Sequence, residues 1–154
     1  WTEPLDRIRP PYNISVLDAE ATRFALQHFE VFAQQTAALC EARTTLAARL
    51  QALVGPQGAL GVNGLDTVYP SAANFVLVRV ADTVAGATPT AQPSRATRVA
   101  AAMRERGVLI KDASRMHPLL ANCLRLTVGT PAENEAMLAA LTEALQAIPA
   151  GREA

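Results

Sequence analysis

Hydrophobic side chains recur every seven residues along the segment 30–54, at Phe32, Leu39, Leu46 and Leu53. This spacing returns to the same side of an α-helix after two turns, so it predicts one long amphipathic helix. A coiled coil shows the same repeat, but the segment is short for one, and a helix lying along a domain is the simpler interpretation. A second helical pattern, over residues 15–28, precedes it and starts at a typical N-cap residue, Ser15.

The rest of the chain alternates between short strand patterns and two further helical patterns. We expect strands at 66–69, 74–80, 108–111 and 123–128. We expect helices from Ser94 to about Gly107 and from 131 to about 148. The order α-α-β-β-α-β-β-α predicts an α/β fold (an α+β two-layer arrangement), with a small sheet of about four strands and helices on one face.

The chain divides into parts of different composition. We expect an extended lead-in at 1–14, interdomain helices at 15–54 and a small C-terminal α/β domain at 55–154. Within that domain the Ala-, Thr- and Pro-rich stretch 81–94 is predicted to be a loop. The sequence begins at Trp1 rather than at a methionine, which favours a piece of a longer protein.

Charge and apolar content argue against several classes of partner. The 14 Lys and Arg residues balance 14 Asp and Glu residues, so no basic surface for nucleic acid is predicted. No apolar run approaches the roughly 18 residues of a membrane span. The two cysteines, Cys40 and Cys123, are too few for a disulfide framework and suit reduced, buried thiols in a cytoplasmic protein.

An arginine lies in the middle of the predicted strand 123–128. Strand alternation puts the leucines on one face and Arg125 on the other, away from the core. A solvated surface arginine is the simplest interpretation. However, the sequence has a single lysine, Lys111, at the end of the preceding strand, and a hairpin would bring it beside Arg125. Two adjacent cations repel, so Asp112, another acid or a bound anion must offset them; an anion site is the alternative hypothesis.

Other polar residues give weaker signals. His117 could act as a general base, but a loop histidine beside a proline is usually solvated or packed, and His28 on a helix is expected to be structural. Ser71 and Asn74 favour a turn with side-chain hydrogen bonds. No residues have the spacing of metal ligands, and no Gly-rich phosphate loop follows a strand.

Four stretches together resemble one family: RPPYN (9–13), YPSAANFVLVR (69–79), GVLIKD (107–112) and HPLLANCLRLTVGTPAEN (117–134). They are similar to the C-terminal part of the histidinol-phosphate aminotransferases, pyridoxal-phosphate enzymes of the aspartate aminotransferase fold type. The resemblance covers nearly the whole chain. It implies amino transfer between L-glutamate and imidazole-acetol phosphate in histidine biosynthesis, in a cytoplasmic homodimer with a large domain upstream.

The resemblance also implies roles for individual residues. Arg125 matches the arginine that holds the substrate carboxylate or phosphate, and Lys111 lies where a second basic residue is common. Tyr12, Asn13 and Asn74 are implied active-site neighbours. The lysine that holds the cofactor as a Schiff base lies in a Ser-x-x-Lys stretch that this sequence lacks, so the chain alone is expected to be inactive and not to bind pyridoxal phosphate.

Two alternatives stay open beside this interpretation. The first is the small domain of another pyridoxal-phosphate aminotransferase or decarboxylase of the same fold type. The second is an α/β ligand-binding or interaction module with no catalysis of its own.

Overall fold

The computed structural model describes residues 14–82 and 93–151. Tyr12, Asn13 and most of the predicted loop 81–94 therefore lie outside the described residues. Backbone contacts divide the chain into two units, 1–37 and 38–154, and the boundary falls inside a helix. The expected boundary between 54 and 55 stays a prediction about domain organisation.

The first unit contains helix α2 (Val16–Gln27) and the beginning of helix α3 (Phe29–Gln51). As predicted, Ser15 caps α2: its hydroxyl accepts a hydrogen bond from the Asp18 amide at 3.0 Å. At the other end the His28 ring lies 4.4 Å from the Phe24 ring, which agrees with a structural histidine. No residue of α2 is buried.

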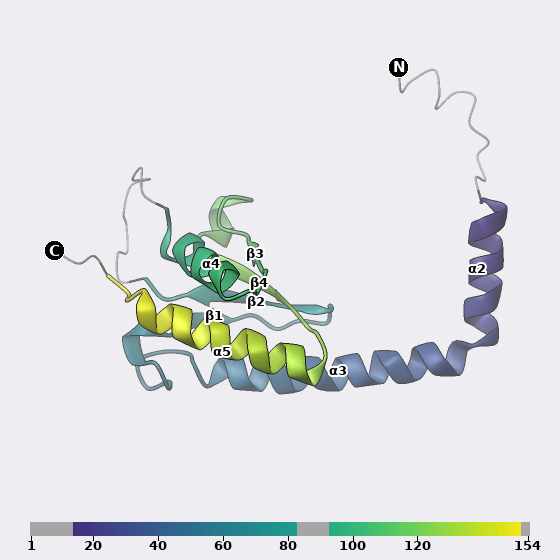
Figure 1. The fold of residues 1–154 in the computed structure, drawn as a ribbon, viewed down its shortest axis with the longest axis horizontal. Helices are drawn as coiled ribbons and strands as arrows, with labels where there is room; N and C mark the ends of the chain where they lie inside the picture. The colour runs from purple at the N-terminus through teal and green to yellow at the C-terminus, as the bar shows by residue number, and fades with distance from the viewer. Residues whose placement is uncertain (1–13, 83–92, 152–154) are drawn as a thin grey trace, which may run out of the picture. The chain divides into compact units, whose positions relative to one another are not determined.

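The second unit is built on a four-stranded sheet (Figure 1). Its strands are β1 (Leu65–Val68), β2 (Phe75–Val80), β3 (Lys111–Asp112) and β4 (Cys123–Thr127). They lie in the order β1-β2-β4-β3, and every neighbouring pair is antiparallel. Strands β2 and β3 therefore run parallel with β4 between them, so the connection through helix α4 crosses over one strand.

The strand predicted at 108–111 is a partial error, because β3 contains only Lys111–Asp112. The preceding residues complete the end of helix α4 (Arg95–Glu105) instead. Gly107 has φ +79°, the left-handed conformation predicted for a helix end, and the Val108 amide donates to the Met103 carbonyl at 3.0 Å. The backbone of Val108 is thus used for the helix terminus, and sheet pairing starts three residues later than expected.

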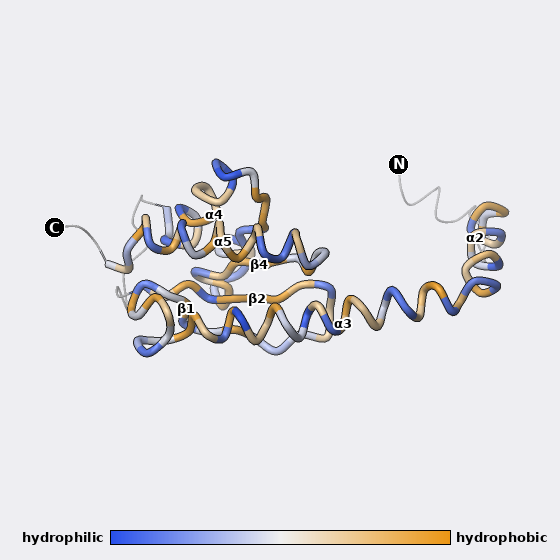
Figure 2. The backbone as a smooth tube through the Cα atoms, turned by 60° about the horizontal axis from the view of Figure 1, so that its bottom comes forward, coloured by the Kyte–Doolittle hydropathy of each residue, from blue (hydrophilic) through white to orange (hydrophobic). Residues whose placement is uncertain are grey.

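Three helices cover one face of the sheet. The second half of α3, helix α4 and helix α5 (Pro131–Ala147) supply apolar side chains to one core. The sheet supplies Val76, Val78, Leu124 and Leu126, and these residues are 0% exposed. The apolar colouring along β2 in Figure 2 reflects this position in the centre of the sheet. The predicted two-layer α/β architecture is therefore confirmed.

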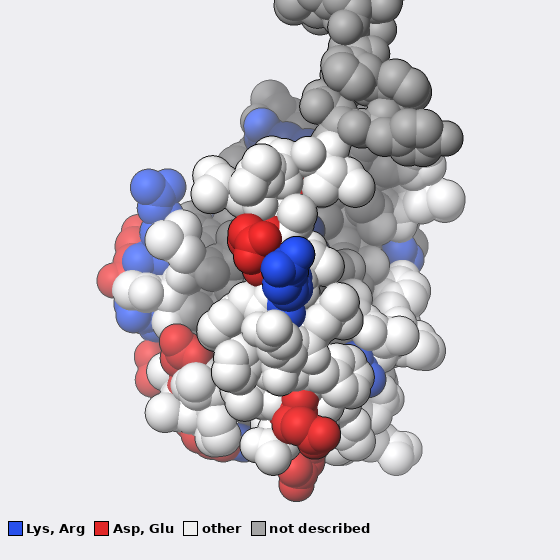
Figure 3. All heavy atoms as spheres, turned by 90° about the vertical axis from the view of Figure 1, so that its right-hand side faces the viewer, with Lys and Arg blue, Asp and Glu red and all other residues white. Residues whose placement is uncertain are grey.

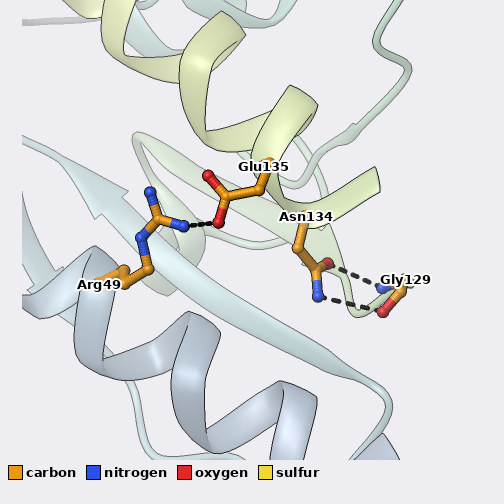
Figure 4. A network of polar contacts seen from close by, with 4 residues as sticks. All are labelled: Arg49, Gly129, Asn134 and Glu135. Atoms are coloured by element: carbon orange, nitrogen blue, oxygen red, sulfur yellow. Dashed lines mark hydrogen bonds and ion pairs between the residues drawn. The ribbon is translucent and has the colours of Figure 1, made fainter. Parts of the chain in front are cut away.

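The turn from β4 into α5 is fixed by local hydrogen bonds. Thr130 and Glu133 form the predicted capping box, with Pro131 in the first helical turn. The buried Asn134 side chain holds both the amide and the carbonyl of Gly129, at 2.9 and 3.0 Å (Figure 4). One residue further along α5, Glu135 forms an ion pair with Arg49 of α3 (Figure 4).

Candidate functional site

The sheet face opposite the helices carries the arginine that stood out in the sequence. Arg125 pairs in register with Leu77 of β2 on one side and with Lys111 of β3 on the other. The predicted hairpin contact between Lys111 and Arg125 is therefore present, and both residues are exposed. Directly opposed residues of an antiparallel pair have Cβ atoms about 4.5–5.5 Å apart, so two positive charges lie side by side on this face.

Asp112 does not offset these charges, although it is next to Lys111 in the chain. It pairs with Leu124 and so belongs to the helix-covered face. There its carboxylate accepts hydrogen bonds from the Thr97 hydroxyl at 2.7 Å and from the Ser114 amide at 2.9 Å. Burial raises the pKa of Asp112, but hydrogen bonds from Ser114 and Thr97 outweigh this effect, and the pKa lies below its ordinary value.

Within the described residues, Arg125 and Lys111 form neither an ion pair nor a side-chain hydrogen bond with the protein. Arg125 has an aromatic neighbour: its guanidinium carbon lies 5.2 Å from the centre of the Phe75 ring. The N–H groups of the guanidinium are thus available to an external anion. A guanidinium beside an ammonium group suits a carboxylate or a phosphate.

A second arginine on the same face, Arg79, both contacts an aromatic ring and donates a hydrogen bond to the protein. Arg79 lies over the Tyr69 ring, 5.8 Å from its centre, and donates to the Leu119 carbonyl at 2.8 Å. The nearby Cys123 side chain raises the pKa of Arg79 above its ordinary value, although partial burial acts in the opposite direction. Arg79 therefore holds the 3-10 turn Pro118–Leu120 over this end of the sheet.

The remaining candidates have structural contacts. The ring of His117 accepts a hydrogen bond from the Leu119 amide at 3.2 Å and so caps the 3-10 turn. Ser71 makes the predicted turn, because its hydroxyl donates to the Phe75 carbonyl and accepts from the Ala73 amide. The neighbouring Asn74 contributes its backbone carbonyl to the Val128 amide.

Across residues 14–82 and 93–151, the cysteines and possible metal ligands form no further site. Both cysteines are free; Cys123 is buried, whereas Cys40 is half-buried rather than buried as expected. Among the residues that the structure describes, no three His, Cys, Asp or Glu side chains gather closely enough to hold a metal ion.

Arg95 is a buried charged residue that no pattern considered in the sequence pointed to. Its side chain is 1% exposed and donates to backbone carbonyls of Asn63, Ala81, Leu145 and Ile148 at 2.5–3.0 Å. Burial lowers the pKa of Arg95, and the charge of Asp82 partly offsets this effect. One signal was present in the sequence: a cation in the first turn of α4 opposes the helix dipole, so it needs another partner.

An open hollow of about 460 Å³ lies between α3 and the end of the β1–β2 hairpin. Arg43, Gln51 and Val68 are among the residues that line it, and Arg43 donates to the Ala73 carbonyl at 3.2 Å. Neither Arg125 nor Lys111 belongs to its lining. Arg125 and Lys111 therefore lie on the open sheet face and not in this hollow.

The face of the molecule drawn in Figure 3 carries charges of both signs. In the view of Figure 3, basic and acidic side chains are interspersed among uncharged ones. This distribution agrees with the balance of 14 basic and 14 acidic residues. Over residues 14–82 and 93–151, none of the helices combines the length and the apolar character that a membrane crossing requires.

Comparison with known proteins confirms the resemblance seen in the sequence. The chain is 47% identical over 141 residues to the histidinol-phosphate aminotransferase of Acidovorax sp. (strain JS42), a match that covers 92% of this chain and 32% of that protein. It is 44% identical to histidinol-phosphate aminotransferase 2 of Burkholderia pseudomallei (strain 1710b), over 94% of this chain and 34% of that protein. The chain thus spans about a third of the length of these relatives. No protein-family model matches it.

Solved structures show the same fold. The histidinol-phosphate aminotransferase of Clostridium acetobutylicum superposes with a TM-score of 0.68 at 16% identity, over 93% of this chain and 37% of that one. A decarboxylase from Sulfurospirillum multivorans superposes with a TM-score of 0.59 at 21% identity, over 87% of this chain and 33% of that one.

Proposed function

We propose that this chain is the small C-terminal domain of a histidinol-phosphate aminotransferase, together with the helices that precede it. The observation that carries the proposal is the pairing of Arg125 with Lys111 on the open sheet face, without an acidic partner among the described residues. The identity of 42–47% to relatives of that name supports it. The whole enzyme would transfer the amino group of L-glutamate to imidazole-acetol phosphate, giving histidinol phosphate and 2-oxoglutarate.

In this reaction the chain supplies the clamp for the substrate anion. The planar guanidinium of Arg125 can donate two parallel hydrogen bonds to a carboxylate of glutamate or to the phosphate of histidinol phosphate. Lys111 adds a point charge beside it, which favours the more highly charged phosphate. Asn74, and Tyr12 and Asn13 beyond the described residues, are proposed as neighbours of the bound substrate.

The cofactor of such an enzyme is pyridoxal phosphate, which withdraws electrons from the bond that reacts. The residues of this chain do not fit the role of its anchor. Lys111 is the only lysine in the sequence, and its register beside Arg125 supports a role in the proposed anion clamp instead. We propose that the cofactor is bound by the large domain and that this chain alone does not catalyse transamination.

The large domain is also the proposed partner of the first unit. Large apolar side chains of residues 14–32 are 42–81% exposed, namely Ile14, Val16, Leu17, Phe24, Leu26, Phe29, Val31 and Phe32. Side chains of this kind are normally covered in a stable protein. We propose that residues 15–54 are the interdomain helices of a cytoplasmic homodimer and that 1–14 lead in from the large domain.

The proposal is tested by measuring transamination from glutamate to imidazole-acetol phosphate, with the full-length protein and with this chain alone. We expect activity only in the full-length protein. Replacing Arg125 by lysine removes the bidentate contact and should cost about 1.5–3 kcal/mol of substrate binding. This corresponds to a KM roughly ten- to a hundredfold higher. The matched control is Arg98→Lys, at an exposed position of α4. Unchanged kinetics for both substrates in Arg125→Lys would refute the proposed clamp.

A second candidate is another enzyme of this fold type, because the decarboxylase of Sulfurospirillum multivorans shares the fold. The two candidates differ in what happens to the substrate carboxylate. Release of carbon dioxide from an amino acid by the full-length protein, without formation of 2-oxoglutarate, would favour the decarboxylase. A full-length protein that has neither activity but still binds anions would favour the non-catalytic module.

A further inference from the structure

Arg125 contacts the aromatic ring of Phe75 on the open face of the sheet. Phe75 pairs in register with Thr127 and Leu77 pairs with Arg125, so Phe75 is the diagonal neighbour of the arginine on the same face. Diagonal neighbours are within reach of each other when one side chain is aromatic and the other is long. The separation of 5.2 Å between the guanidinium carbon and the ring centre is within the range of a cation–π interaction.

Unlike a hydrogen bond, this contact with the ring does not use the N–H groups of the Arg125 guanidinium. A hydrogen bond would use the N–H groups that an anion needs, whereas a ring attracts the cation and accepts none of them in a strong bond. Arg79 illustrates the contrast, since it lies over Tyr69 but also donates to the Leu119 carbonyl. In the described residues the donors of Arg125 are given to no protein acceptor.

We propose that Phe75 is a positioning residue, which holds the guanidinium of Arg125 for the anion. The inference rests on the proposed anion clamp. An exposed arginine samples many rotamers, and binding must restrict them. Phe75 is half-buried, and its backbone is held by the Ser71 hydroxyl and by pairing with Thr127, so its ring samples fewer orientations than a freely exposed side chain. The ring thus removes part of the ordering cost before the anion arrives.

The proposal is tested on this chain by titration with inorganic phosphate, followed by NMR through the side-chain Nε–Hε signal of Arg125. Phe75→Leu keeps an apolar side chain but removes the ring, and Phe75→Tyr keeps the ring. We expect the dissociation constant for phosphate to rise about two- to fivefold in Phe75→Leu, as expected for an exposed cation–π contact. It should be unchanged in Phe75→Tyr. The matched control Tyr69→Leu removes the stack on Arg79 and should leave phosphate binding unchanged.

A measurement on the wild-type chain is independent of whether the variants fold. The ring should shift the δ-methylene protons of Arg125 upfield, and the shift should vanish in Phe75→Leu. Absence of this shift in the wild type, or equal phosphate affinity in Phe75→Leu and wild type, would overturn the positioning role alone. If the Arg125 signal of the wild type does not respond to phosphate, the anion clamp itself is wrong, and the inference that rests on it is wrong as well.

Discussion

Replacing Arg95 by methionine tests whether one buried cation holds the second unit together. Methionine keeps an unbranched stem of similar length but removes every donor. In the structure Arg95 donates to four carbonyls at 2.5–3.0 Å, two of them near the C-terminus of α5, and its side chain is 1% exposed. The substitution leaves these acceptors without their partner.

The size of the effect follows from the number of acceptors. A buried acceptor without a donor costs about 1–3 kcal/mol. If water reaches half of the four carbonyls, the other two give a loss of about 2–6 kcal/mol, with a central value of about 4 kcal/mol. This is a large part of the roughly 5–15 kcal/mol by which domains are stable.

The assay is urea unfolding followed by helical circular dichroism. With a denaturant slope of about 2 kcal/mol per molar, the midpoint should fall by roughly 2 M. The control is Arg98→Met on the exposed side of the same helix, which should change stability by less than about 0.5 kcal/mol. If Arg95→Met unfolds at the same urea concentration as this control, the carbonyls do not depend on the guanidinium and the reasoning is refuted.

Two further predictions concern hydrogen-bonded side chains of the second unit. Thr130→Ala removes the cap of α5 and should destabilise the protein by about 1 kcal/mol in the same urea assay. Thr130→Ser keeps the hydroxyl and should retain most of the stability. An equal loss of stability in both variants would argue against the capping role. The pKa of Asp112 is lower in the folded state than in the unfolded state. The ionised carboxylate therefore stabilises the protein at any pH above the unfolded pKa of about 3.9. This stabilisation is lost as the pH falls through the lower, folded-state pKa. Asp112→Asn should therefore be less stable than wild type at pH 6, with the difference shrinking in acid, and a difference that is constant from pH 6 to pH 2 would contradict this linkage.

Local patterns in the sequence predicted the helices, most of the strand residues and the sheet face on which Arg125 lies. The alternation of β4 separates Leu124 from Arg125, and the structure places them on opposite faces of the sheet. The capping box of α5 joins Thr130 to Glu133, three residues apart. In both cases the geometry of a single element decides the outcome, so it can be inferred from spacing alone.

The same reasoning was less successful where a polar group of the backbone or of a side chain had two possible partners. The apolar run after Gly107 predicted a strand from 108, but the Val108 amide completes α4. Similarly, Asp112 was a possible counter-ion for Lys111, yet its carboxylate is bound by Thr97 and Ser114 on the other face of the sheet. Sequence spacing cannot rank such competing partners, because their energies depend on which segments pack nearby.

By itself, the sequence determined the succession of helices and strands and the sheet face on which Arg125 lies, because both depend on the period of each element. It also determined the resemblance of the chain to one enzyme family, because that resemblance rests on contiguous motifs. Only the tertiary structure decided what each arginine contacts. Arg95 reaches carbonyls that lie 14 to 53 residues away, and Arg125 meets the ring of Phe75 through the register of two strands. The physical reason is that such contacts are set by the packing of separate segments: one arginine is buried among backbone carbonyls, and the other lies exposed on the sheet beside an aromatic ring.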